Sequence, residues 1–292
     1  MASLKERVKA PIAVVRRRFP VLDHGIRMQQ HYGEVKASQQ AGAVTYFGFL
    51  SVFPVLALAF FAVGYVSKVF PDAQEALLGA IDEMFPNLIG SGEGKLDLSE
   101  IQDSAGTVGL FGLVGVLYAG LGWLSALRSA LNTVFGLSNE ERPNFLMGKA
   151  RDLMALVVIG VVMVFTVGVT GVIAGFSEDL LQWLNLNAEL GWVVQLLTVV
   201  LGLVANAVLF FVMFRLLASP NLPRRALISG ALLGAVGFEV LKQLSAPLIG
   251  STQGNPAFQV FGLALILVVW INYFSRVVLY AAAWAQTAPE SV

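Results

Sequence analysis

The sequence predicts an all-α protein, a polytopic integral membrane helical bundle of six transmembrane helices. The chain is 57% hydrophobic and only 13% charged, whereas about 25% of the residues in an average soluble domain are charged. Its long apolar runs, and basic residues that gather on one side of them, also indicate a membrane protein. A chain of this composition could not cover its own surface with polar groups in water, so we expect much of that surface to face lipid.

Six apolar runs reach the roughly 20 residues that a helix needs to cross a bilayer core about 30 Å thick. Each is expected to be helical, because lipid offers no partner for a free backbone amide. The first run is too long, and its preceding segment too charged, for a cleavable signal peptide. The predicted spans are residues 41–67, 106–127, 153–175, 191–217, 227–249 and 258–285.

Basic residues predict that both termini are cytoplasmic. Eight of the 19 basic residues precede residue 40, and others border the loops after the second and fourth spans. The opposite side holds Lys68 and Lys95 with eight acids between Asp72 and Asp103. The balance of 19 acids and 19 bases gives no indication of a nucleic acid partner.

These patterns divide the chain into a basic cytoplasmic interfacial leader (1–40), a membrane domain (41–285) and a short cytoplasmic tail (286–292). In the leader, "VVRRRFP" contains Arg16, Arg17 and Arg18, which either simply flank the first span or hold a surface helix on anionic lipid. His24 and His31 lie seven residues apart without enough further ligands for a metal site. We expect both histidines to be solvated.

The outer loop, residues 71–105, carries apolar residues at helical spacing, with acids mostly on the other faces. This pattern favours an amphipathic helix at the outer interface or over the bundle. A calcium site is the alternative, although the acids lack the spacing of a known calcium loop.

Small residues four apart predict close helix packing, at Gly171 with Gly175 and at Gly230 with Gly234. Pro54 of the first span removes a backbone donor, so we expect a kink beside Ser51 and Pro54 that serves either packing or a hinge.

The most informative residues are charges inside the fifth span. With a rise of 1.5 Å per residue from Leu227, Glu239 lies about 18 Å and Lys242 about 22 Å into the membrane. Spacings of three and four residues put Gln243 on the same helix face. An unpaired charge at this depth costs at least about 2.5–3.5 kcal/mol, so Glu239 and Lys242 are expected to pair. The pair either fixes helix register or lines a polar pathway.

Other polar residues fall at related depths. Asn272 and Arg276 lie in the cytoplasmic half of the last span, and Asn206 lies at a similar depth in the fourth. Ser125, Arg128, Ser129 and Asn132 form a polar face at the inner end of the second span. Arg128 and Arg276 either snorkel to the cytoplasmic surface or line the same pathway.

Four stretches carry a family resemblance: "AVTYFGFLSVFPVLAL" (43–58), "ALNTVFGL" (130–137), "FRLLASPNLPRRALISGALLGAVGFEVLKQL" (214–244) and "FGLALILVVWINYFSRVVLYAAAW" (261–284). Together they resemble the BrkB/YihY/YhjD family of bacterial inner-membrane proteins over nearly the whole chain. "LLASPNLP" departs from the family's usual stretch before the short inner loop. The resemblance implies six spans in the inner membrane, a role in the cell envelope and, through the YhjD branch, lipid movement across that membrane.

The family was also long labelled a ribonuclease, but metal-assisted phosphodiester cleavage needs carboxylates or histidines clustered around metal ions. Here the acids concentrate on the predicted outer face, and the chain has no cysteine. We therefore expect no enzyme activity, no metal, no cofactor and no nucleic acid partner.

The leading hypothesis is translocation of a phospholipid or glycolipid, with a substrate path along Glu239, Lys242, Gln243, Asn206, Asn272 and Arg276. An ion or small-solute transporter or channel would use the same residues. A non-transporting scaffold for envelope integrity or assembly would instead dock partners on the small-residue faces and the outer helix. The expected partners are membrane lipids, with a homo-oligomer or envelope proteins as further alternatives.

Overall fold

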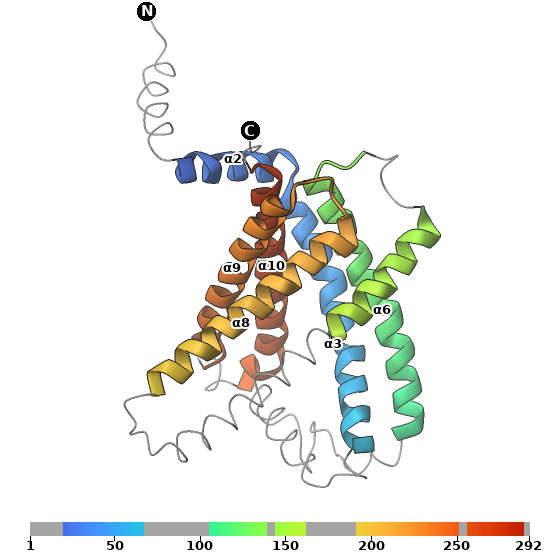
Figure 1. The fold of residues 1–292 in the computed structure, drawn as a ribbon. Coiled ribbons are helices and arrows are strands. Elements are labelled where there is room, and N and C mark those ends of the chain that lie inside the picture. Colours follow the sequence, from blue (N-terminus) through green and yellow to red (C-terminus); the bar gives the residue numbers. More distant parts are fainter. Residues whose placement is uncertain (1–19, 67–104, 139–143, 162–190, 251–255, 289–292) are drawn as a thin grey trace, which may run out of the picture. The chain divides into compact units, whose positions relative to one another are not determined.

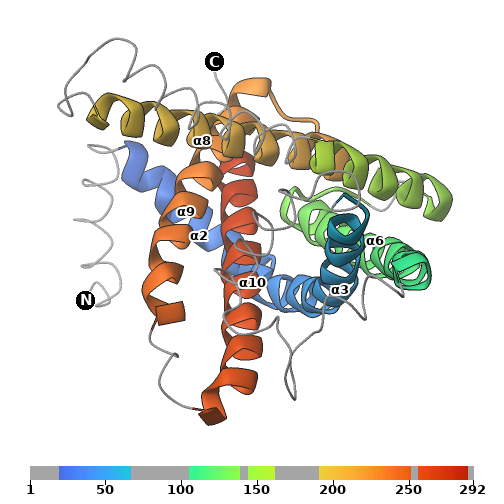
Figure 2. The ribbon, with the colours of Figure 1, turned by 90° about the horizontal axis from the view of Figure 1, so that it is seen from below.

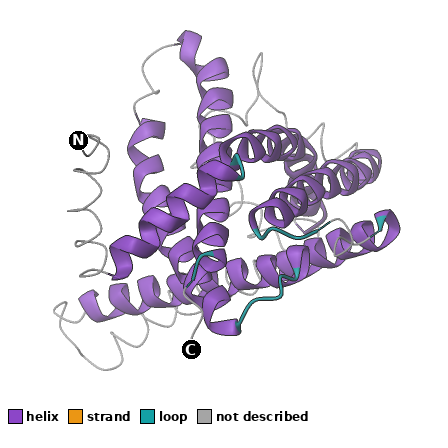
Figure 3. Cartoon of the chain, turned by 90° about the horizontal axis from the view of Figure 1, so that it is seen from above, coloured by secondary structure: helices purple, strands orange, loops and turns teal. Residues whose placement is uncertain are grey.

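A computed structural model describes residues 20–66, 105–138, 144–161, 191–250 and 256–288. Within these ranges every regular element is a helix, as Figure 3 shows, so the all-α prediction is confirmed. The helices are α2 (Pro20–Glu34), α3 (Ala37–Val66), α6 (Ala105–Val134), a helix over residues 145–161, α8 (Gly191–Met213), the π-helical turn η2 (Phe214–Ala218), α9 (Arg224–Gly250) and α10 (Pro256–Gln286).

Each predicted span overlaps one of these helices in its described residues, and the structure extends some of them. The second predicted span ends at residue 127, whereas α6 continues to Val134. Hydropathy marks only the apolar part of a helix, and the helix can extend beyond it. Within the described residues, three segments are long and apolar enough to cross a membrane: Val199–Ala218, Arg224–Leu244 and Ala264–Gln286. The count of six spans stays a prediction. Residues 162–175 of the third span and nearly all of the outer loop lie outside the described residues.

The chain divides into two compact units. The smaller one, Tyr46–Trp123, contains the later part of α3 and the earlier part of α6. Here a Cβ on Gly122 would lie 3.3 Å from the ring of Phe47, so the glycine lets the two helices approach each other. In the same unit the buried Ser51 hydroxyl donates to the Gly48 carbonyl at 2.7 Å.

In the larger unit, α9 packs against both α8 and α10 (Figures 1 and 2). A Cβ on Gly230 would lie 2.6 Å from the backbone oxygen of Ala281 in α10, and a Cβ on Gly234 would overlap the ring of Phe210 in α8. Further along, Phe238 packs edge-on against Trp270 and Phe274 of α10. The small residues of "GALLG" therefore serve close contact with two different helices.

Two helix ends in this unit have defined caps. At the end of α6, Gly136 adopts a φ of +64° and donates to the Thr133 carbonyl, while Leu137 donates to the Asn132 carbonyl. This is the Schellman arrangement, in which a glycine in the left-handed region ends the helix. After α8, η2 ends at Ser219, whose φ is +49° and whose N–H donates to the Phe214 carbonyl. The "SPNLP" segment then leads into α9.

Helix α2 lies across the C-terminal end of α10 rather than alongside it (Figure 1). The rings of Tyr32 and Tyr280 stack at 3.8 Å with only 3° between their planes. The Tyr280 hydroxyl is 3.0 Å from Oε1 of Gln29, to which it donates. These contacts fasten the leader segment to the last helix.

Candidate functional site

The expected ion pair in α9 is present. Lys242 Nζ lies 2.6 Å from Glu239 Oε2, one helical turn away, and 5.5 Å from the centre of the Phe238 ring. The Lys242 side chain is 43% exposed and that of Glu239 is 22% exposed. The α9 pair, as we call these two residues, is therefore not sealed between packed helices.

The rest of α9 explains this exposure. Gly230 and Gly237 face α10 and Gly234 faces α8, so these residues mark the packed side of the helix. An exposed apolar stripe with a spacing of four residues runs along another side, made of Ile228, Leu232, Val236, Val240 and Leu244. Residues three and four apart are neighbours on a helix surface. Glu239 is thus beside Val236, and the exposed Gln243 is beside both Glu239 and Val240. The α9 pair therefore borders the apolar stripe through Glu239.

The structure places Asn272 and Arg276 in a different environment. Arg276 Nε donates to Asn272 Oδ1 at 2.9 Å, and Asn272 Nδ2 donates to Thr45 Oγ1 of α3 at 3.1 Å. Thr45 in turn donates to the Ala41 carbonyl at 2.6 Å. The residues of α10 that meet α9 are others, among them Phe274 and Val277. Asn272 and Arg276 are therefore joined to α3 and not to the α9 pair by these contacts.

The other residues that the sequence singled out belong to neither of these two groups or lie outside the described residues. Asn206 is half-buried on α8, one turn before Phe210. Helix α3 continues through Pro54 to Val66, while the expected kink stays a prediction. Gly171, Gly175, Arg16, Arg17 and Arg18 lie outside the described residues.

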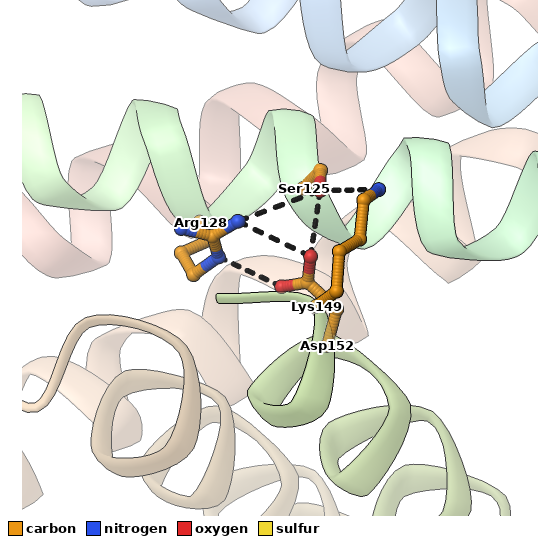
Figure 4. A network of polar contacts seen from close by, with 4 residues as sticks. All are labelled: Ser125, Arg128, Lys149 and Asp152. Atoms are coloured by element: carbon orange, nitrogen blue, oxygen red, sulfur yellow. Dashed lines mark hydrogen bonds and ion pairs between the residues drawn. The ribbon is translucent and has the colours of Figure 1, made fainter. Parts of the chain in front are cut away.

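A second polar centre, the Asp152 cluster, joins the end of α6 to the helix over 145–161 (Figure 4). Asp152 is fully buried, and its Oδ1 accepts from Arg128 Nε at 2.8 Å. Its Oδ2 accepts from the Ser125 hydroxyl at 2.6 Å and from the Arg128 guanidinium at 3.2 Å. Lys149 Nζ donates to the same Ser125 oxygen at 3.0 Å. Ser125, Arg128, Lys149 and Asp152 form the whole cluster.

A helix cap and a glycine allow the Asp152 cluster to form. Asn144 caps the helix over 145–161 by accepting from the Met147 N–H at 2.9 Å. The Arg128 guanidinium lies where a side chain on Gly148 would be, with Nη2 2.9 Å from an ideal Cβ position. Glycine at 148 therefore leaves room for the fork of Arg128 to reach Asp152. The pairing with a buried carboxylate shows Arg128 bonded inside the protein instead of simply snorkelling.

Sequence reasoning missed Asp152 and Lys149. The signal that could have found Asp152 is its position, an acid directly at the predicted cytoplasmic start of an apolar run. Such a residue needs a buried partner, and Arg128 at the end of the second predicted span is one.

The prediction that both histidines are solvated is wrong. His24 is 7% exposed, its ring stacks on that of Trp284 at 3.6 Å, and its Nε2 lies 2.9 Å from the Trp284 carbonyl oxygen. His31 Nε2 lies 2.7 Å from the carbonyl oxygen of Val134. A carbonyl can only accept, so Nε2 carries the proton in both rings.

These carbonyls belong to the last turns of α10 and α6, where carbonyls lack partners from the helix itself. The two histidines thus satisfy two helix ends at once, and burial lowers the pKa of His24 below its ordinary value of 6.5. Within the described residues, no group of three or more histidines and carboxylates is placed to hold a metal ion.

Long apolar helices whose charges are paired or hydrogen-bonded define a polytopic α-helical membrane protein. Residues 28–292 match the family described as virulence factor BrkB. The chain belongs to this family and is a multi-pass protein of the bacterial inner membrane.

Two relatives of this chain are likewise described as membrane proteins. The chain is 30% identical to the inner membrane protein YhjD of Escherichia coli, with 93% of this chain and 82% of that protein covered. It is also 27% identical to a UPF0761 membrane protein of Ralstonia nicotianae, with 88% of this chain and 56% of that protein covered. No solved structure matches the chain.

Proposed function

We propose that this protein moves a polar-headed lipid across the inner membrane. The observation that carries the proposal is the position of the α9 pair. Two charges lie deep in a predicted span, partly exposed, at the border of an exposed apolar stripe. A lipid needs polar contacts for its headgroup and an apolar surface for its tails, and this side of α9 offers both next to each other.

The energetics favour this interpretation over a purely structural pair. A lone charge at the bilayer centre costs at least about 2.5–3.5 kcal/mol. The pairing of Glu239 with Lys242 offsets part of this cost, and their exposed surface leaves room for a headgroup to offset more. A headgroup phosphate beside Lys242 and a headgroup hydroxyl or amine beside Glu239 would add polar contacts to those that the pair already makes. The headgroup would then be stabilised at the depth where crossing is otherwise most unfavourable.

The position of the pair also bears on the alternatives. A scaffold would have Glu239 and Lys242 sealed between packed helices, whereas Lys242 is 43% exposed. An ion or small-solute pathway would use the same charges, but it has no need of an apolar stripe beside them. The stripe is the feature that favours a lipid.

The test is transfer of a fluorescently labelled phospholipid between leaflets of proteoliposomes, followed by chemical quenching of the outer leaflet. We expect the wild type to accelerate transfer over protein-free vesicles. Glu239→Gln and Lys242→Met should each slow transfer at least about tenfold, since each removes a charge-assisted contact. Arg225→Met, which removes an exposed cation at the start of the same helix, is the matched control and should leave transfer unchanged.

Each variant should first be shown to fold by its helical signal and thermal transition. A wild type that transfers no lipid contradicts the proposal. Ion leakage through the wild type without lipid transfer would favour the transporter or channel alternative.

A further inference from the structure

The Asp152 cluster carries one positive charge more than its carboxylate neutralises. Arg128 binds both carboxylate oxygens of Asp152 through its Nε and Nη2 groups. The Ser125 hydroxyl gives Oδ2 a further donor. Lys149 contacts the Ser125 oxygen instead, a neutral acceptor. The buried carboxylate is thus already satisfied by Arg128 and Ser125, and the Lys149 ammonium is left as the surplus charge.

The surroundings of Lys149 indicate which kind of ligand its charge could bind. Three large apolar residues, Phe145, Leu146 and Met147, stand just before it, and all three are exposed. Further exposed apolar residues follow on the same helix, including Met154 and Val157. In an inner-membrane protein such a surface faces acyl chains. The cluster lies at the end of α6 that the basic residues predict to be cytoplasmic, so Lys149 is expected at the depth of the inner-leaflet headgroups.

We propose that Lys149, held by Ser125, binds the phosphate of an anionic phospholipid of the inner leaflet. The ammonium has three N–H donors, of which one is directed at Ser125. The other two can donate to phosphate oxygens, which accept strongly from charged donors. Asp152 does not repel this anion from close by, because it is fully buried and paired with Arg128. The exposed side chains at 145–147 then contact the upper acyl chains.

This site is distinct from the α9 pair and stands whether or not lipid crosses the membrane. Arg128 and Asp152 act as positioning residues, since they fix Ser125 and the helix that carries Lys149. Lys149 is the residue that touches the ligand.

The test uses the full-length protein in detergent and measures binding of a short-chain phosphatidylglycerol by native mass spectrometry. Short-chain phosphatidylcholine, which has a phosphate but no net charge, tests whether the lipid must be anionic. Inorganic phosphate tests whether the site binds free phosphate instead of a lipid headgroup. We expect Lys149→Met to weaken phosphatidylglycerol binding about tenfold, the scale of a charge-assisted contact. Lys149→Arg should restore it. Arg224→Met removes an exposed cation at the start of α9 and should have no effect.

The wild type provides a second measurement that does not depend on a variant folding. Added salt should weaken phosphatidylglycerol binding but change phosphatidylcholine binding little, because only the former carries net charge. Equal binding by wild type and a folded Lys149→Met variant overturns the proposal. Binding of inorganic phosphate as tight as that of phosphatidylglycerol overturns the assignment to a lipid.

Discussion

At the scale of single residues, the ion pair between Arg128 and Asp152 is the contact whose loss should cost most. Arg128 is 16% exposed and Asp152 is fully buried. Removing one partner of a buried pair leaves an uncompensated charge, which costs about 3–5 kcal/mol.

We therefore predict that Asp152→Asn, which keeps the shape of the side chain but removes its charge, destabilises the protein by about 3 kcal/mol. Detergent-induced unfolding followed by tryptophan fluorescence measures the loss. The double variant Asp152→Asn with Arg128→Gln removes both charges of the pair and should recover part of the stability. Equal stability of Asp152→Asn and wild type would show that the pair contributes nothing.

The residue scale also shows what sequence reasoning could and could not reach. Glu239 and Lys242 lie three positions apart on one helix, so helical geometry alone predicts their contact. Asp152 and Arg128 lie 24 positions apart on two helices. Their contact depends on how those helices pack, which no local pattern specifies. The same holds for His24, whose partner Trp284 is 260 positions away.

At the scale of elements, the packing of α9 depends on glycines at definite positions. A Cβ on Gly230 would lie 2.6 Å from the Ala281 backbone oxygen and 2.7 Å from the Ala285 Cβ, so α9 and α10 would have to separate. Gly202 of α8 provides a matched control, because a Cβ there meets nothing within 4 Å.

We predict that Gly230→Ala lowers the free energy of unfolding by about 1–3 kcal/mol, the usual range for overpacking. Gly202→Ala should be neutral or stabilise by up to about 1 kcal/mol, since alanine favours the helix. Thermal unfolding of both variants in one detergent makes the comparison. The account of α9 packing fails if Gly230→Ala is as stable as Gly202→Ala.

The docking of α2 is a second property of an element, and it should depend on pH. Burial lowers the pKa of His24 relative to its ordinary value of 6.5; nearby Arg27 lowers it as well, while the Trp284 hydrogen bond and Asp23 oppose the shift. The docked helix therefore favours the neutral ring. Its stabilisation is complete above pH 6.5 and is lost as pH falls through 6.5 toward the lower pKa of the docked state.

We predict that the α2 amides exchange faster at about pH 5.5 than at about pH 7.5 once intrinsic exchange rates are corrected, because the undocked helix binds the proton more readily. Hydrogen exchange with mass spectrometry measures this directly. His24→Gln keeps a side-chain donor for the Trp284 carbonyl but cannot titrate, so it should remove most of the pH dependence. A wild type with identical corrected exchange at both pH values would contradict the role of His24.

At the scale of the whole molecule, composition predicted the fold class because lipid leaves few alternatives to the helix. Helix ends were less predictable. Hydropathy marks where a chain leaves the bilayer, whereas α6 ends at Val134, just before the glycine cap at Gly136. The leader was predicted to be basic and interfacial, but its docking on α10 through Tyr32 and His24 is a tertiary contact that composition does not record.

The central claim is that the α9 pair acts in lipid transfer and is more than a structural contact. The most direct test exchanges the two charges by combining Glu239→Lys with Lys242→Glu. The ion pair on α9 is kept, so the fold should survive, but the more exposed position now carries a negative charge that repels a headgroup phosphate. We predict that the folded exchange variant loses lipid transfer in proteoliposomes. Transfer at the wild-type rate would contradict the claim and leave Glu239 and Lys242 as a structural pair.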